Sequence, residues 1–247
     1  RYHSMQAGSG RFFAYSEYMN GVSSGSFCRF AGRYVRKEQR MQNINNIDHI
    51  NEKIKKIAKE IEPELISIRR ELHQYPELGI NLPKTHDIIS RDLYKIPNLT
   101  IREHMAGGCG IIAELQGKKP QGKNLLLRAD IDALPLEEKA VNDYRSKYPG
   151  CMHACGHDGH ATWLIGAAKI LARLTDEFGG CIRFAFQPGE EVGLGADTMI
   201  KEDKVLENPK IDMAFAAHGW PSVESGKIGI VRRYAFGCVG GFKVKII

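Results

Sequence analysis

Several features that would assign this chain to a specialised class of protein are missing. No apolar run reaches the roughly 18 residues that a membrane-spanning helix needs, and the first residues lack the apolar core of a signal peptide. Six cysteines are scattered without the dense, regular framework of a small secreted domain. The formal net charge is only +6, and the basic residues form no blocks that would follow a phosphate backbone. We therefore expect no membrane or nucleic-acid partner, free thiols, and the cytoplasm as the default location.

What is present is an ordinary globular composition. The 247 residues are 43% hydrophobic and 26% charged, enough to bury the core of one large domain or two small ones. Residues 1–42 are rich in Ser, Gly and Arg and show neither helical nor strand periodicity. We expect them to be a leader outside the fold, either a native extension or a remnant upstream of a true start at Met41.

The rest of the sequence alternates helical and strand patterns. Isoleucines repeat at helical spacing over 50–61, and Pro63 then suits the first turn of a new helix or a kink. Further expected elements are helices at 85–94 and 159–174 and strands at 100–103, 110–116, 125–129, 182–186 and 213–217. Strands that alternate with helices, several of them continuously apolar, predict an α/β fold: a three-layer sandwich with a mostly parallel central sheet.

The C-terminal part predicts two more strands, at 226–230 and 242–247. The sequence stops inside the second of these strands. We therefore expect a fragment that is cut at the opening of a second domain.

One nine-residue segment, MHACGHDGH at 152–160, contains three histidines, a cysteine and an aspartate. Thiolate, imidazole and carboxylate are the groups that hold zinc and neighbouring divalent ions. Cys155 and His157, two residues apart, point to the same side of an extended backbone, and Asp158 is placed to orient a ligand. The alternative interpretation is that two of the histidines are ordinary polar residues at a helix start: His153 and His160.

Polar residues also follow three of the expected strands. Asp130 and Asp132 follow the strand at 125–129, Glu190 and Glu191 come after the strand at 182–186, and His218 follows the strand at 213–217. In parallel sheets ligand sites form at the carboxyl ends of strands, so these side chains are expected to meet. Two adjacent carboxylates leave a strand end in different directions, which favours one as a metal ligand and the other as a general base.

Five motifs, taken in order, closely resemble those of the metal-dependent amidohydrolases. That family includes hippurate hydrolases, N-acyl-amino-acid deacylases and plant auxin-conjugate hydrolases, within the wider aminoacylase and carboxypeptidase group. The resemblance covers residues from about 60 to 247. The motifs are RELH with PELG at 70–79, LRADIDALP at 127–135, MHACGHDGH at 152–160, FQPGEE at 186–191 and HGWP at 218–221.

The resemblance implies a role for each matching residue. Glu190 is similar to the general base of the family, and Asp132 to the residue that orients a ligand. The family holds two divalent ions, commonly zinc, manganese, cobalt or nickel, which polarise the amide carbonyl and activate water. It also has one more histidine ligand near the C-terminus of a full-length chain, which this sequence does not contain. The implied metal ligands present here are Cys155, His157, Glu191 and His218.

The function that the resemblance implies is hydrolysis of the amide bond of N-acyl amino acids or related small acylated amines. It also implies a homodimeric or homo-oligomeric parent protein, with an incomplete catalytic domain at 43–235 and the first strand of a small α+β lid or dimerisation domain at 236–247. One alternative is a dipeptidase or carboxypeptidase with the same metal centre. Others are an inactive fragment that only binds metal and a thiol module based on Cys151 and Cys155.

Overall fold

The computed structural model of the chain describes residues 2–7, 10–15 and 24–230. The chain divides into two compact units, residues 1–57 and residues 58–247. The first unit contains a hairpin of β1 (Tyr2–Ala7) and β2 (Gly10–Tyr15), which pair antiparallel. The sequence patterns gave no sign of these strands. The proposal that residues 1–42 form a leader outside the catalytic domain stays a prediction.

Helix α1 (Ser24–Gln74) begins in the first unit and ends in the second. It continues through Pro63, so no new helix starts at this residue. In the second unit it is followed by α2 (Pro83–Leu93), whose first turn is held by a side chain from the preceding loop. Glu77 accepts the backbone N–H groups of Lys84 and Thr85 at 3.2 and 2.8 Å. The acid of the PELG motif therefore caps this helix.

The second unit is built on a five-stranded sheet in the order β3-β4-β6-β5-β7. Strand β4 pairs antiparallel with both β3 and β6, whereas β5 pairs parallel with both β6 and β7. Four strands thus run in one direction and β4 alone runs in the other. The strands are β3 (Leu99–Met105), β4 (Gly110–Gln116), β5 (Leu125–Asp130), β6 (Cys181–Gln187) and β7 (Met213–Ala216).

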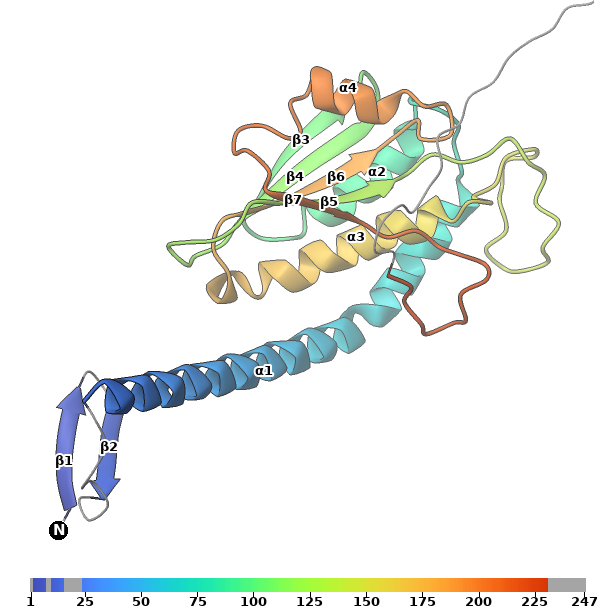
Figure 1. Cartoon of the computed structure of the whole chain (residues 1–247). Coiled ribbons are helices and arrows are strands. Elements are labelled where there is room, and N and C mark those ends of the chain that lie inside the picture. The colour runs from blue at the N-terminus through green and yellow to red at the C-terminus, as the bar shows by residue number, and fades with distance from the viewer. Residues whose placement is uncertain (1, 8–9, 16–23, 231–247) are drawn as a thin grey trace, which may run out of the picture. The chain divides into compact units, whose positions relative to one another are not determined.

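The connections between the parallel strands change direction across the sheet. The chain passes from β5 through α3 (His157–Ala172) to β6, and then through α4 (Gly195–Lys201) to β7 on the far side of β5. Right-handed crossovers in opposite directions place their helices on opposite faces. Figure 1 shows α2 and α3 on one side of the sheet and α4 on the other. In open α/β sheets, ligands bind outside the carboxyl ends of the strands at the point where such a reversal occurs.

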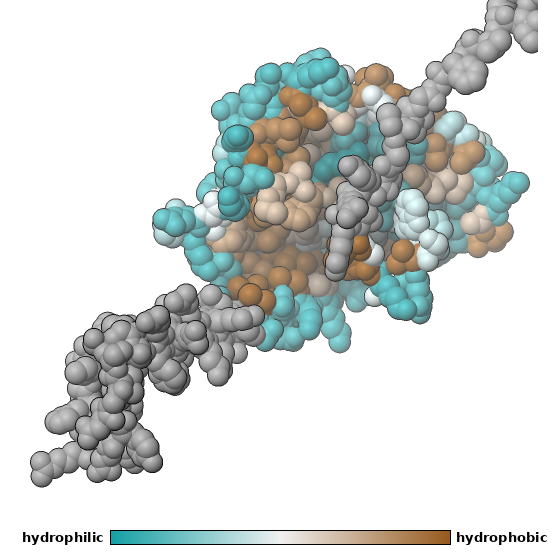
Figure 2. Space-filling view, in the orientation of Figure 1, coloured by the Kyte–Doolittle hydropathy of each residue, from teal (hydrophilic) through white to brown (hydrophobic). Residues whose placement is uncertain are grey.

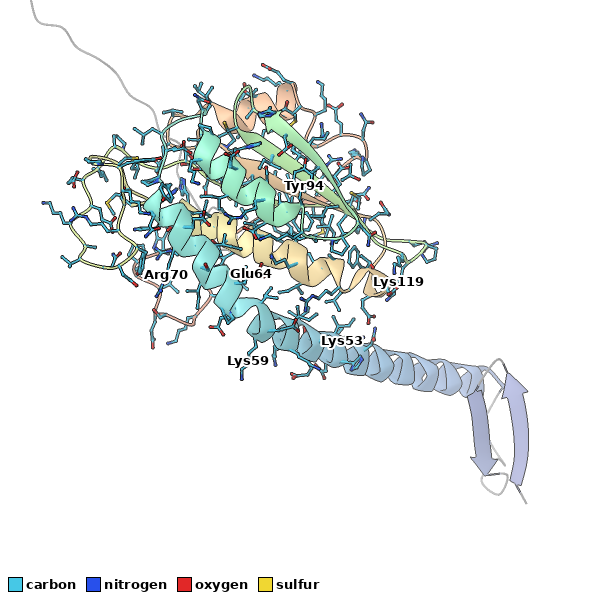
Figure 3. The ribbon with its side chains drawn as sticks, turned by 180° about the vertical axis from the view of Figure 1, so that it is seen from behind. Lys53, Lys59, Glu64, Arg70, Tyr94 and Lys119 are labelled. Carbon is cyan, nitrogen blue, oxygen red and sulfur yellow. The ribbon has the colours of Figure 1, made fainter. Side chains whose placement is uncertain are left out.

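Each face of the sheet has its own hydrophobic core, as the alternation of side chains along β4 requires. Ile111 and Leu115 pack with α1, α2 and α3 in the larger core, while Ile112 packs with Met199 of α4 in the smaller one. Polar contacts also join the helices on the face that carries the larger core. There, Glu64 of α1 lies beside α3 and accepts a hydrogen bond from Lys169 at 2.7 Å (Figure 3). The fold is therefore a three-layer α/β sandwich.

The edge of the sheet at β7 is less covered. Its four residues are all exposed, and Met213 and Phe215 are each 50% exposed. Hydrophobic atoms gather on the face of the molecule on which β7 lies (Figure 2). None of the helices in the part of the chain that the structure describes is both long and apolar enough to cross a membrane.

The α/β prediction is confirmed, and the predicted strands in 100–217 and the helices at 85–94 and 159–174 all occur. The strand predicted at 226–230 is wrong, because these residues have no ladder partner among the described strands. Ile228 and Ile230 are exposed, so their alternation buries no face. The strand predicted at 242–247 lies outside the described residues, and α4 was not predicted.

Candidate metal centre

Asp132 organises the turn that carries the two adjacent glutamates. It lies just beyond the end of β5, is buried, and accepts the backbone N–H of Glu190 on Oδ1 and that of Glu191 on Oδ2, both at 3.1 Å. Gly189, which precedes the pair, has a φ of +66°, a conformation that favours glycine. The turn after β6 is therefore fixed beside the end of β5, with the backbone of both glutamates held by one carboxylate.

The segment before α3 is attached to the same region. Met152 and Leu134 form an antiparallel bridge that holds the cysteine–histidine motif next to the loop after β5. Gly156 caps α3 with a φ of +92°, so the chain turns sharply between Cys155 and His157. Because of this turn, the first residue of the helix, His157, is fully buried next to the loop after β5.

Donor atoms of Cys155, His157 and Glu191 all lie within 4.8 Å of one another. His157 Nε2 is 3.8 Å from Glu191 Oε1 and 4.0 Å from Glu190 Oε2, and its Nδ1 is 3.4 Å from Asp132 Oδ1. Three of the predicted ligands, the predicted base and the predicted orienting residue thus meet at one point. They come from the loops after β5 and β6 and from the start of α3, as the strand-end argument expected.

The fourth predicted ligand reaches the same cluster from the loop after β7. His218 Nε2 lies 3.5 Å from Cys155 Sγ, and its Nδ1 lies 2.7 Å from the carbonyl oxygen of Gly219. A ring nitrogen next to a carbonyl carries the proton, so Nε2 offers its lone pair toward the thiol. This is the arrangement that metal-binding histidines use, with the second nitrogen held by a backbone carbonyl.

The electrostatics of the cluster favour a cation. Burial, followed by the neighbouring Glu191, raises the pKa of the Cys155 thiol to about 12. Burial alone would lower the pKa of His157, but Asp132, Asp130 and Glu191 raise it overall. Both ring nitrogens of His157 are buried without a hydrogen-bond partner. Buried ring nitrogens that lack a hydrogen bond, together with a thiol among carboxylates, fit a divalent ion, which would satisfy the ring and stabilise the thiolate.

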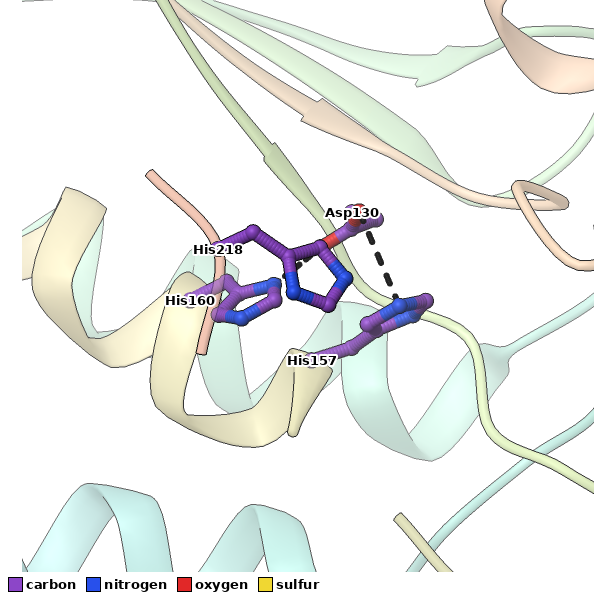
Figure 4. A group of neighbouring side chains, drawn as sticks. All are labelled: Asp130, His157, His160 and His218. Atoms are coloured by element: carbon purple, nitrogen blue, oxygen red, sulfur yellow. Dashed lines mark hydrogen bonds and ion pairs between the residues drawn. The ribbon is translucent and has the colours of Figure 1, made fainter. Parts of the chain in front are cut away.

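A second group of possible ligands overlaps the first: Asp130, His157, His160 and His218 (Figure 4). His160 Nδ1 is 2.6 Å from Asp130 Oδ1, a contact that sequence reasoning did not predict. Burial would raise the pKa of Asp130, but the bond with His160 and the charges of Arg128 and His157 lower it to about 2. The sequence feature that indicates the position of His160 near the donor cluster is its spacing: it is three residues after His157 and so shares its face of the helix.

Asp158 does not contact the donor cluster. Its Oδ2 pairs with His73 Nδ1 at 2.7 Å and with Arg69 Nε at 2.9 Å, both on α1. The sequence interpretation of Asp158 as an orienting residue for a metal ligand therefore has no contact to support it. His73 also lies 3.2 Å from Glu138, so the histidine of the RELH motif joins α1 to α3 and to the loop after β5. These contacts hold the start of α3 against α1 and the loop after β5.

The chain is similar in sequence to known proteins. Residues 126–244 match the family described as peptidase family M20/M25/M40. An N-acyl-L-amino acid amidohydrolase of Geobacillus stearothermophilus is 37% identical over 196 residues, which are 79% of this chain and 52% of the relative. An N-acetyl-L-cysteine deacetylase of Bacillus subtilis is 43% identical over 186 residues, which are 75% of this chain and 43% of the relative. The chain thus spans about half the length of the curated relatives it matches.

The fold agrees with that of a solved structure of similar sequence. The YXEP protein of Bacillus subtilis, described as a dinuclear metal binding peptidase from the M20 family, is 38% identical with a TM-score of 0.62. The match covers 66% of this chain and 45% of that structure. Sequence, fold and the arrangement of the donor residues agree in identifying residues 126–244 as a segment of peptidase family M20/M25/M40.

Proposed function

We propose that the protein hydrolyses the amide bond of N-acyl amino acids or related small acylated amines at a divalent-metal centre. The observation that carries this proposal is the convergence of four donors from three separate segments, one of them a buried histidine whose ring nitrogens have no hydrogen-bond partner. The donors are Cys155, His157, Glu191 and His218. The names of the two curated relatives, an amidohydrolase and a deacetylase, support the same reaction.

In this proposal Glu190 is the general base. Its side chain is 41% exposed and stands 4.0 Å from His157 Nε2, so it has access to both the solvent and the donor cluster. It takes a proton from the attacking water and transfers it to the leaving amine. A divalent ion in such a site supplies Lewis acidity, which polarises a carbonyl and makes water easier to deprotonate.

Asp132 acts as a positioning residue in the same proposal. Because it holds the N–H groups of both glutamates and faces His157, it keeps the base and two proposed ligands in register. A buried carboxylate that fixes ligand orientation is a recurring part of metal sites. The ion is zinc, manganese, cobalt or nickel, since a site with nitrogen, oxygen and sulfur donors accepts each of them.

The test is deacylation by the full-length protein after chelation and reloading with zinc, manganese or cobalt. A panel of N-acetyl and N-benzoyl amino acids should be cleaved, and Glu190→Gln should lower kcat by about 10²- to 10⁴-fold while the metal content stays unchanged. The matched control is Glu202→Gln, an exposed glutamate at the C-terminal end of α4, which should leave kcat unchanged. Turnover retained by Glu190→Gln would contradict the assignment of the base.

Peptide hydrolysis at the same centre is the second candidate, because the YXEP structure is described as a peptidase. Measuring hydrolysis of dipeptides and of N-acetyl amino acids at equal concentration distinguishes the two candidates. We expect a higher kcat/KM for the acetylated compounds. We also propose that the whole protein is a homodimer, which light scattering of the full-length protein would test.

A further inference from the structure

His160 uses both of its ring nitrogens within the protein. Nδ1 is 2.6 Å from Asp130 Oδ1, and Nε2 accepts the backbone N–H of Gly219 at 2.8 Å. A nitrogen that accepts a hydrogen bond carries no proton, so the Gly219 contact assigns the ring proton to Nδ1, where Asp130 accepts it. The ring is only 2% exposed, so water does not compete for either nitrogen. No lone pair of His160 remains for a metal ion.

The residue that His160 holds is the neighbour of a proposed ligand. The carbonyl of Gly219 is 2.7 Å from Nδ1 of His218, while its N–H is donated to His160. The rings of His160 and His218 also touch edge to face, with centroids 4.5 Å apart (Figure 4). The position of His160 therefore determines where His218 stands relative to Cys155.

The other side of His160 is attached to the sheet. Asp130 is buried at the end of β5, and Arg128 Nη1 pairs with its Oδ2 at 2.8 Å. Arg128 in turn donates from Nε to Gln187 at the end of β6, at 2.9 Å. The chain of contacts thus runs from two strand ends through α3 to the loop after β7. A loop without a packed core of its own gains a fixed position from such contacts.

We propose that His160 is a positioning residue for His218: with Asp130 it fixes the Gly219 peptide, and it does not itself ligate metal. This inference rests on the proposed function, in which His218 is a ligand. Positioning partners of metal-binding histidines typically change metal affinity 10- to 100-fold when they are removed. Their loss does not change the set of ligand atoms.

Three variants of the whole chain separate the two contacts. In His160→Asn the amide nitrogen stands near the place of Nδ1, so only the Asp130 contact is kept. In His160→Gln the amide oxygen stands near the place of Nε2, so the Gly219 contact is kept, and His160→Ala removes both. Without metal, the Gly219 amide should exchange with solvent about tenfold faster in the Ala and Asn variants than in the wild type. The Gln variant should restore the slow exchange.

The second measurement is calorimetric titration with zinc alone. His160→Ala should weaken zinc binding by about 10- to 100-fold, and His160→Gln should stay within about threefold of the wild type. The control is His86→Ala, another buried histidine outside the site, which should leave zinc affinity unchanged. Cobalt(II) spectra of His160→Gln should keep the wild-type bands, because the ligand atoms are the same.

Two results would overturn the inference while the proposed function stands. One is a wild-type zinc affinity and slow Gly219 exchange in His160→Ala. The other is a shift of the cobalt bands in His160→Gln that matches the shift in His218→Ala, which would make His160 a ligand. If the wild type itself binds no zinc, the proposed function fails and the role of His160 in metal binding fails with it. Slow Gly219 exchange that depends on His160 would then identify a purely structural contact.

Discussion

Arg183, in the middle of β6, is the strongest candidate for a large loss of stability by one substitution. Its side chain is completely buried and pairs with Glu114 of β4 at 2.5 Å. It also donates to three backbone carbonyl groups of one loop, those of Val205, Glu207 and Asn208, at 2.6, 2.9 and 3.0 Å. The guanidinium thus joins the sheet to the loop between α4 and β7. Arg183→Met keeps the length and apolar stem of the side chain and removes every one of these contacts.

The expected cost follows from what the substitution leaves behind. Removing one partner of a buried ion pair costs about 3–5 kcal/mol, because the other partner stays desolvated. Glu114 is 26% exposed and regains some water, so we expect the lower end, about 3 kcal/mol. Adding Glu114→Met to Arg183→Met removes the stranded carboxylate. The double variant should recover about 1–2 kcal/mol of the loss, and the unpaired carbonyl groups account for the remainder.

Urea unfolding of the single and double variants measures these differences, with the slope used to check that the transition keeps its cooperativity. The matched control is Arg173→Met, which breaks an ion pair with Glu60 in which both side chains are about half exposed. Such pairs contribute at most about 1 kcal/mol. A loss in Arg183→Met that is no greater than in this control would refute the reasoning, because the buried guanidinium would then contribute nothing beyond a surface pair.

Three further predictions concern stability. Burial would raise the pKa of Asp92, but hydrogen bonds from Lys95 and Arg91 lower it overall. The contribution of Asp92 to the free energy of unfolding is therefore present above about pH 4 and is lost as the pH falls through the folded-state pKa. Asp92→Asn should cost about 1.5–3 kcal/mol at pH 7 by urea unfolding, and a cost that is equally large at pH 2 would contradict this cause. Gly195→Ala places a methyl group 1.7 Å from a backbone oxygen and should lower the free energy of unfolding by about 1–3 kcal/mol. Gly159→Ala brings its methyl group near no other atom, so in the same assay it should raise the free energy of unfolding by about 0.5–1 kcal/mol. Zinc added to the chelated chain should raise the free energy of unfolding by about 1.4 kcal/mol for each tenfold excess over Kd, and a thermal midpoint independent of zinc would contradict binding to the folded state.

The sequence was informative where a pattern has one physical meaning. Continuous apolar runs located the buried strands, and polar residues directly after them located the rim of the sheet. Because parallel strand ends share one edge, residues as far apart as Asp132 and Glu190 were expected to meet, and the structure brings the backbone of one to the carboxylate of the other at 3.1 Å. The roles of the individual site residues remain predictions.

What the sequence did not reveal depends on pairing between distant segments. Arg183 interrupts an apolar strand, and nothing local indicates that Glu114 and a loop after α4 will satisfy its charge. The His160–Asp130 contact was missed for the same reason, since a histidine on a buried helix face has many possible partners. The prediction of a strand at 226–230 was wrong because period-two alternation indicates a strand only where another strand pairs with it, and none of the described strands does so.

The candidate metal centre also constrains the order in which the chain folds. Cys155 and His218 are 63 positions apart, and Asp132 and Glu190 are 58 apart, so the donors meet only after long loops have closed. Loop closure is an entropic cost that contacts between the strands must first offset, and parallel pairing therefore forms slowly. We expect His218 to arrive last, because it follows β7, which comes after both crossovers in the chain and pairs with β5. A metal ion should therefore bind tightly only to a chain in which β7 has already joined the sheet, and the rate of tight binding during refolding would report the rate at which that strand pairs.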